Sequence, residues 1–225
     1  MTSWRAGSSL LLTAGLVACG GARPVPSAGP VVGPSGAASP AELARADGGI
    51  PPHTPADVEF MAGMIVHHAQ AVLIAGWAPS HEAGAAVRVL CERIVVAQRD
   101  EIGFMQHWLR GRGLPVPDAD PSHFMMPGMG DNLHPGMLST EQLRNLDQAR
   151  GAEFDRLFLT YMIQHHEGAI TMVDQLLGST GAAQDDDVWK LAADIHADQT
   201  TEINRMHTML AAPLNRSSPS QRDSS

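Results

Sequence analysis

The sequence predicts an all-α domain, a four-helix bundle made of two copies of one helical hairpin. The chain of 225 residues contains 12 methionines, and only 4% of its residues are aromatic. This composition favours helix, because alanine, leucine and methionine have high helix propensity whereas strands prefer β-branched and aromatic residues. The chain also contains an internal repeat of one helix pair. Two amphipathic hairpins bury their apolar faces best by packing against each other, which gives the bundle.

The repeat is visible when the two halves of the chain are aligned. Residues 57–72 align without gaps with residues 155–170, and residues 94–109 align with residues 195–210. The identical pairs in the first helix of each half are Asp57/Asp155, Phe60/Phe158, Met64/Met162, Ile65/Ile163, His67/His165, His68/His166 and Ala71/Ala169. Those in the second helix are Ile94/Ile195, Gln98/Gln199, Glu101/Glu202, Ile102/Ile203, Met105/Met206 and Leu109/Leu210. Such a repeat indicates one structural unit that is used twice.

The first hairpin is bounded by ordinary helix signals. The first predicted helix begins after Thr54, whose hydroxyl can cap it, and runs to about Trp77, ahead of Pro79. The second follows Ser80 and ends near Arg110, where glycines stop it.

The second hairpin begins with a capping box at residues 139–142. We expect one long helix from there to about Leu177, with Gly151 as a break or kink. The last helix follows three acidic residues at 185–187, which suit a helix N-terminus, and ends near Leu210.

The N-terminus has the pattern of an export signal. Residues 1–18 combine Arg5 with an apolar stretch too short for a membrane span, and they end in Leu-Val-Ala before Cys19. This resembles a bacterial lipobox, so we expect Cys19 to be lipidated; an ordinary secretory signal with a chance cysteine is the alternative. Residues 19–53 would then be the lipidated cysteine and a flexible tether rich in Pro, Gly, Ala and Ser. Residues 213–225 are expected to be a disordered tail.

The predicted domain covers residues 54–212. It divides into a first hairpin (54–110), a methionine-rich loop (111–138) and a second hairpin (139–212). If Cys19 is lipidated, Cys91 is the one remaining cysteine and no internal disulfide can form. Cys91 lies in an apolar helical pattern, so we interpret it as a small buried hydrophobic residue.

Each copy places two histidines one turn after a methionine on the inward face of a helix. In the first copy Met64 and His68 share this face, with His67 beside them, and the second copy repeats the pattern. A buried imidazole without a partner costs about 1–3 kcal/mol, so a duplicated pair needs an explanation. Imidazole binds several transition metals, and thioether sulfur narrows the choice to Cu(I), with Ag(I) by chemical likeness. The first-choice ligands are Met64, His67, His68, Met162, His165 and His166, and the supporting candidates are Met61, Met105 and Met206.

A structural role is the alternative for these histidines. They could hydrogen-bond Gln98, Gln199, Glu101 or Glu202 on the partner helices. The single histidines elsewhere, His53, His81, His107, His196 and His207, are expected to be surface or cap residues.

The predicted loop carries further candidate ligands. A methionine in a loop has no core to fill, so a second, flexible cuprous site is one interpretation and a hydrophobic lid over the bundle is the other. The residues concerned are His123, Met125, Met126, Met129, His134 and Met137.

Other chemistries fit the sequence less well. The formal net charge of −9 argues against nucleic acid as a partner. The helices contain no inward Glu-x-x-His pair of the di-iron type, no glycine-rich phosphate loop and no recognisable nucleophile–base arrangement. We therefore expect a binding protein rather than an enzyme. Glu167, which follows the second histidine pair, could serve as a base or as an oxygen ligand.

One stretch of the second half resembles a known family. Residues 158–172 read Phe-Leu-x-x-Met-x-x-His-His-Glu-Gly-Ala-x-x-Met, and residues 134–137 and 151–155 also fit the pattern. This is similar to the CopM-like family, a group of bacterial proteins long described as a domain of unknown function. The resemblance implies a ferritin-like four-helix fold, export and, for some members, copper binding and copper resistance. The first copy departs from it, with Ala69-Gln70 where the second has Glu167-Gly168, and Ile74 in place of Met172.

The sequence thus predicts a protein anchored by lipid to a cell envelope membrane and facing the periplasm or the exterior. Its expected cofactor is Cu(I), which it would sequester, transfer or detoxify. Its expected partners are the metal ion, the membrane and a copper donor or acceptor protein. Two alternatives stay open, an oxidoreductase that uses the bundle metal and an envelope interaction module with purely structural histidines.

Overall fold

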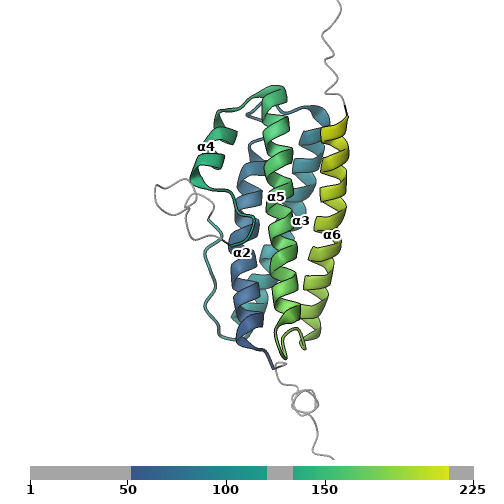
Figure 1. Cartoon of the computed structure of the whole chain (residues 1–225). Helices are drawn as coiled ribbons and strands as arrows, with labels where there is room; N and C mark the ends of the chain where they lie inside the picture. Colours follow the sequence, from purple (N-terminus) through teal and green to yellow (C-terminus); the bar gives the residue numbers. More distant parts are fainter. Residues whose placement is uncertain (1–51, 121–133, 213–225) are drawn as a thin grey trace, which may run out of the picture. The chain divides into compact units, whose positions relative to one another are not determined.

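The computed structural model describes residues 52–120 and 134–212, and these parts are helical without any strand. Figure 1 shows four long helices and one short helix. The long helices are α2 (Pro55–Gly76), α3 (Ala85–Gly111), α5 (Gly151–Gly178) and α6 (Asp186–Ala211), and the short one is α4 (Thr140–Gln148). The all-α prediction is confirmed.

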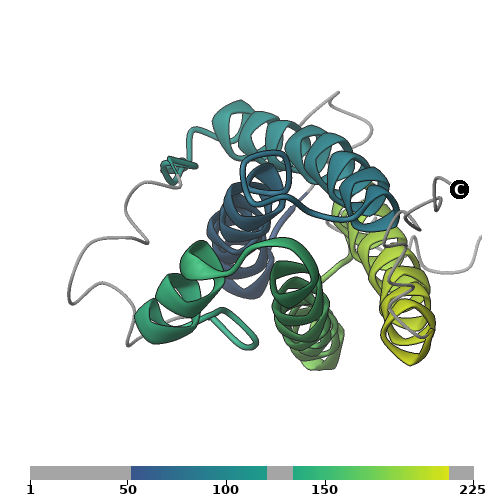
Figure 2. The same ribbon diagram turned by 90° about the horizontal axis from the view of Figure 1, so that it is seen from above.

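The long helices form two hairpins that meet along their first helices. Helix α2 packs against α3, α5 packs against α6, and α2 packs against α5 at the centre, while α4 lies against α5. Figure 2 shows the bundle from above, with α2 beside α3 and α5 beside α6. The duplicated hairpin therefore packs the first helix of each copy, which carries the histidine pair, against its counterpart.

The helix boundaries follow their caps. Thr54 and Asp57 form a complete capping box on α2, with proline at the first helical position. Asp185 caps α6 by accepting a hydrogen bond from the Asp187 amide. Helix α3 begins at Ala85, later than predicted.

The third predicted helix is two helices. A capping box at Ser139 and Gln142 starts α4, but extended backbone at Ala149 and Arg150 ends it. Gly151 then adopts a positive φ of 57°, which glycine tolerates, and α5 starts there in a new direction. The expected break is therefore a complete separation.

Two buried aspartates tie the hairpins to each other. Asp57 at the start of α2 accepts a hydrogen bond of 2.7 Å from the Ala183 amide in the α5–α6 turn. Asp155, its counterpart on α5, accepts bonds of 3.0 and 3.1 Å from the Gly84 amide in the α2–α3 turn. Each hairpin thus supplies the acceptor for the other hairpin's turn.

Helix α2 is the core helix of this arrangement. By length and composition alone it could cross a membrane, but 67% of its most apolar window is buried inside the bundle. Its apolar character is explained by this central position, because it contacts both α3 and α5.

Candidate metal centre

Four histidines lie together where α2 and α5 pack against each other. His67, His68, His165 and His166 are all fully buried. The ring centroids of His67 and His165 are 3.8 Å apart, and each ring lies about 6 Å from its sequence neighbour, at 6.3 Å for His68 and 6.2 Å for His166. The duplication has brought both histidine pairs into one cluster, as the sequence predicts.

The outer helices contribute one carboxylate to each copy of the cluster. Nε2 of His166 and a carboxylate oxygen of Glu202 on α6 are 2.8 Å apart. Nε2 of His68 lies 2.7 Å from a carboxylate oxygen of Glu101 on α3, though off the ring's hydrogen-bonding direction. The hydrogen bond proposed as the structural alternative is thus formed at His166, whereas at His68 the carboxylate is close but not hydrogen-bonded.

The glutamines that were candidates for the same role take no part in it. Gln98 and Gln199 are buried on α3 and α6, one turn before the two glutamates. Both side-chain amide atoms of Gln98 and the amide oxygen of Gln199 lack a hydrogen-bond partner. The glutamines add unpaired polar atoms to the core and satisfy none of the histidines.

Several ring nitrogens of the cluster have no partner. They are Nδ1 of all four histidines and, in addition, Nε2 of His68 and Nε2 of His165. A buried polar atom that has lost water without gaining a partner costs about 1–3 kcal/mol. Protein structures rarely keep several such atoms in one place without a ligand. The unpartnered nitrogens therefore fit a metal ion, which would accept their lone pairs.

Burial keeps the imidazoles of His67, His165 and His166 in the neutral form that binds metal. It lowers the pKa of His67 and His165 well below 6.5, and the charges of neighbouring histidines add to the effect. The pKa of His166 is also lowered by burial, although Glu202 opposes the shift. Neutral imidazole has a free lone pair, so these three rings can coordinate a metal near neutral pH.

Two methionine pairs flank the histidines. Because α2 and α3 are antiparallel and His68 faces Glu101, Met64 and Met105 lie at one level, each four residues away from that contact. The same reasoning from His166 and Glu202 places Met162 level with Met206. Met61 and all four of these methionines are fully buried. Since α2 and α5 are also antiparallel, the pairs lie on opposite sides of the histidines.

The donor set favours a soft metal. Within residues 52–120 and 134–212, no three His, Cys, Asp or Glu side chains converge closely enough to hold a metal by themselves. A metal at the centre would need thioether sulfur or a rotation of the imidazoles. Zn²⁺ rarely takes a thioether ligand, whereas Cu(I) binds both imidazole nitrogen and thioether sulfur.

The segment before α4 covers the histidine cluster. His67 Nε2 donates a hydrogen bond of 3.0 Å to the Pro135 carbonyl oxygen. Gly136 has a φ of 77° and lies directly on Gly168 of α5, where a Cβ would overlap the Pro135 carbonyl. Only glycine allows this close approach of two backbones. The residues 134–138 are called the strap below.

The first copy holds the other end of the strap. Gln70 on α2 donates to the Leu138 carbonyl at 3.1 Å and accepts from the Leu138 amide at 2.7 Å. Gln164 on α5 donates to the Gly136 carbonyl at 3.2 Å. Gln70 is the equivalent of Gly168 in the repeat, and the strap explains why the two copies carry different residues at this position. One copy binds the strap by a side chain and the other makes room for it.

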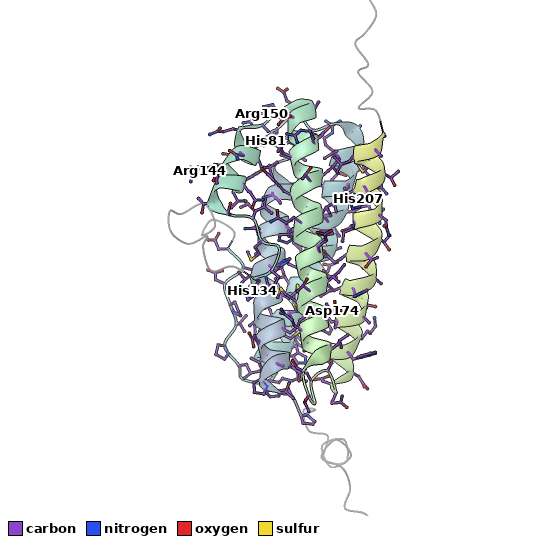
Figure 3. All side chains as sticks on the ribbon, in the orientation of Figure 1. His81, His134, Arg144, Arg150, Asp174 and His207 are labelled. Atoms are coloured by element: carbon purple, nitrogen blue, oxygen red, sulfur yellow. The ribbon has the colours of Figure 1, made fainter. Side chains whose placement is uncertain are left out.

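The loop candidates divide into two groups. His123, Met125, Met126 and Met129 lie outside the described residues. Met137 is 7% exposed and packs in the core, so packing alone accounts for it. His134, which is labelled in Figure 3, packs against Gly63 of α2 and, together with Glu59 and Met172, borders a cavity of about 190 Å³.

The remaining candidates have structural explanations. His81 is buried, so it is not a surface residue, but it acts as a cap, because its Nδ1 lies 3.0 Å from the carbonyl oxygen of Trp77 at the end of α2. Its Nε2 lies 2.9 Å from the Asp147 carbonyl oxygen. His53, His107, His196 and His207 are exposed, as expected. Burial raises the pKa of the Cys91 thiol to about 12, and this cysteine is the buried hydrophobic residue that was predicted.

Sequence comparison identifies the family. The domain of unknown function DUF305 matches residues 57–210, the whole of the helical bundle. The chain belongs to the DUF305 family. This confirms the resemblance to the CopM-like proteins, and a comparison with the curated proteins finds no match.

Solved structures of DUF305 proteins share the fold. A DUF305 fragment from Deinococcus radiodurans is 30% identical, with a TM-score of 0.58 over 71% of this chain and 98% of its own. A DUF305 protein from Streptomyces coelicolor is 28% identical, with a TM-score of 0.58 over 69% and 92%. CopM in a Cu(I)-bound form is 26% identical, with a TM-score of 0.51 over 68% and 94%. The ferritin-like helical fold is thereby confirmed.

Proposed function

We propose that this DUF305 protein is a non-enzymatic copper-binding protein that holds Cu(I) in the core of its bundle. The observation that carries the proposal is the group of unpartnered, fully buried imidazole nitrogens between two buried methionine pairs. The ligands would come from Met64, His67, His68, Met162, His165 and His166, with Met105, Met206 and Met61 in support. A metal ion bound there would accept the lone pairs of the imidazole nitrogens, which have no partner in the metal-free core.

The similarity to CopM supports this choice of metal. CopM has been solved in Cu(I)-bound, Cu(II)-bound and Ag-bound forms. Cu(I) and Ag(I) are soft ions that accept both imidazole and thioether. The same two donor types meet in the core of this chain, and the charge of a bound cation would be offset by Glu101 and Glu202.

We place the protein outside the cytoplasm, held to an envelope membrane through Cys19. This part of the proposal rests on the lipobox pattern, which lies outside the described residues. A domain on such a tether could sequester copper, detoxify it, or exchange it with a donor or acceptor protein. An exchange partner would itself present thioether or thiolate ligands, because Cu(I) moves between soft donors.

A Cu(I) competition titration of methionine variants tests the site. The double variant Met64→Leu, Met162→Leu conserves volume, so its fold should survive with a loss of under about 1.5 kcal/mol per site. Its Cu(I) affinity should fall at least tenfold against a Cu(I) chelator under reducing, anaerobic conditions, and its Zn²⁺ affinity should change much less. Met209→Leu, a partly buried methionine near the end of α6, is the matched control and should bind like wild type.

Two outcomes would contradict the proposal. If the double variant binds Cu(I) like wild type, these methionines are core residues and the site is wrong. If wild type itself binds no Cu(I), the copper function is wrong, and the envelope interaction module becomes the better account.

A further inference from the structure

Both copies place a glutamate close to Nε2 of their inner histidine. On α5, His166 Nε2 is 2.8 Å from Glu202, and on α2, His68 Nε2 is 2.7 Å from Glu101. The glutamates are equivalent residues of the repeat, on the second helix of each hairpin. The contact is therefore duplicated together with the histidines, and it appears in both copies of the core.

The acceptors decide which nitrogen carries the proton. An ionised carboxylate and a backbone carbonyl can only accept hydrogen bonds, so the ring nitrogen facing them must donate. Nε2 is hydrogen-bonded to Glu202 in His166 and to the Pro135 carbonyl in His67, and in His68 it lies 2.7 Å from Glu101, off the hydrogen-bonding direction. In a neutral imidazole the proton then sits on Nε2, and the lone pair sits on Nδ1.

The unpartnered atoms agree with this assignment. In these three rings Nδ1 is buried and has no partner. Both nitrogens of His68 and of His165 lack a hydrogen bond, but His68 Nε2 lies 2.7 Å from a carboxylate oxygen of Glu101, whereas no carboxylate within the described residues pairs with His165. In metal sites a histidine ligand usually donates its other N–H to a carboxylate or a carbonyl, which fixes the ring and raises its basicity.

We infer that Glu101, Glu202 and the Pro135 carbonyl are positioning groups that present Nδ1 of His68, His166 and His67 to the metal. The inference rests on the proposed copper function and adds to it the donor atoms and the groups that select them. Glu101 and Glu202 are the partly exposed members of the arrangement, with side chains 17% and 15% exposed. They therefore link the buried imidazoles to the surface between α3 and α6.

The tautomers can be measured without metal. Long-range ¹H–¹⁵N spectra of ¹⁵N-histidine-labelled full-length apo protein distinguish Nε2–H from Nδ1–H rings. We expect Nε2–H for His67, His68 and His166, with assignment by single histidine variants. This measurement needs no change to either glutamate, so it decides the tautomers even if a glutamate variant fails to fold.

Paired substitutions test the role of the carboxylates. Glu101→Leu with Glu202→Leu removes both acceptors, and Cu(I) affinity should fall about 10- to 100-fold, the usual effect of losing such a partner. The fixed tautomer of His68 and His166 should be lost as well. Glu101→Gln with Glu202→Gln retains an acceptor oxygen and should keep the Nε2–H tautomer and bind Cu(I) within a few fold of wild type.

A charge control separates positioning from attraction. Burial and the charges of Glu101 and Glu202 raise the pKa of Asp198 on α6, so it lies beside them, yet it has no hydrogen bond to any described histidine. Asp198→Asn should leave the tautomers and the affinity within a few fold of wild type. A loss as large as that of the leucine pair would overturn the positioning role in favour of simple charge attraction.

The remaining results separate the inference from the copper function. Nδ1–H rings in a protein that binds Cu(I), or leucine variants that match wild type in both readouts, would overturn the inference alone. A wild type with the expected tautomers and no Cu(I) binding would overturn the proposed function and, with it, the metal role of the glutamates.

Discussion

At the scale of single residues, burial lowers the pKa of His67, His165 and His166 and so favours their neutral form. The sequence predicted all four histidines of the cluster, because the repeat displays them twice and the helical period turns them inward. It did not predict which nitrogen of each ring is bonded. That depends on Glu101, Glu202 and Pro135, which lie about 33 to 68 residues away along the chain and approach only in the folded bundle.

The metal-free protein should lose stability as the pH falls. The pKa of His67 and of His165 in the folded state is well below 6.5, so unfolding increases proton uptake below pH 6.5. Their contribution to stability is complete above that pH and declines as the pH falls towards the folded-state pKa. Between pH 6.5 and 5 the loss should be about 1 to 2 kcal/mol per histidine.

Thermal or urea unfolding of apo protein between pH 7.5 and 5 measures this loss. The double variant His67→Leu, His165→Leu lacks both groups and should show a flatter pH dependence. Equal slopes for wild type and variant would mean that these rings do not resist protonation.

At the scale of elements, the strap is the feature that could not be predicted from the sequence. The mismatch between Gln70 and Gly168 was visible as a departure from the repeat, but its cause was not. Both residues serve the segment 134–138, which reaches them from far along the chain. Helical periodicity says nothing about loops that pack on the helices, so it did not predict the strap. The division of the third helix at Gly151 was predicted only as a break or kink.

A methyl group at Gly168 should displace the strap. Its Cβ would overlap the Pro135 carbonyl and approach Gly136, and both obstacles are backbone. We expect Gly168→Ala to destabilise the protein by about 1–3 kcal/mol, the usual cost of overpacking.

A glycine in an open part of a helix provides the matched control. Gly103 on α3 has nothing within 4 Å of an added Cβ, so Gly103→Ala should stabilise by about 0.5–1 kcal/mol through helix propensity. Thermal melts of the two variants should move in opposite directions. A Gly168→Ala protein as stable as the control would show that the strap does not pack as described.

At the scale of the whole molecule, the two hairpins depend on each other. Asp57 and Asp155 each accept from the turn of the opposite hairpin, and α2 packs against α5 along the centre. The histidine cluster exists only when both hairpins are present, because His67 and His165 come from different halves. The duplication made this architecture predictable, since two equal amphipathic hairpins bury their apolar faces best by packing against each other.

Dissection of the chain should show this dependence. A fragment of residues 54–212 should give a circular dichroism spectrum dominated by helix, whereas residues 54–110 alone should lose cooperative unfolding. The isolated hairpin would expose the face that α5 covers. A stable, cooperatively folded half would contradict mutual burial.

The predicted anchor is tested in the bacterial envelope. Cys19→Ala should leave the protein unlipidated, because the thiol is the site of acylation in a lipobox, and several acyl chains on one residue give stable membrane attachment. Detergent phase partitioning of cell fractions should move the variant to the aqueous phase. The lipoprotein prediction is wrong if wild type and variant partition alike.

X-ray absorption at the copper edge of Cu(I)-loaded protein tests the central claim most directly. The account predicts a first shell with both nitrogen and sulfur scatterers, because imidazole nitrogens and thioether sulfurs meet in the core. It also predicts that Met64→Leu with Met162→Leu diminishes the sulfur shell and leaves the nitrogen shell in place. A shell of nitrogen and oxygen alone in wild type, or a sulfur shell unchanged in the double variant, would contradict the assignment of Cu(I) to the histidine–methionine core.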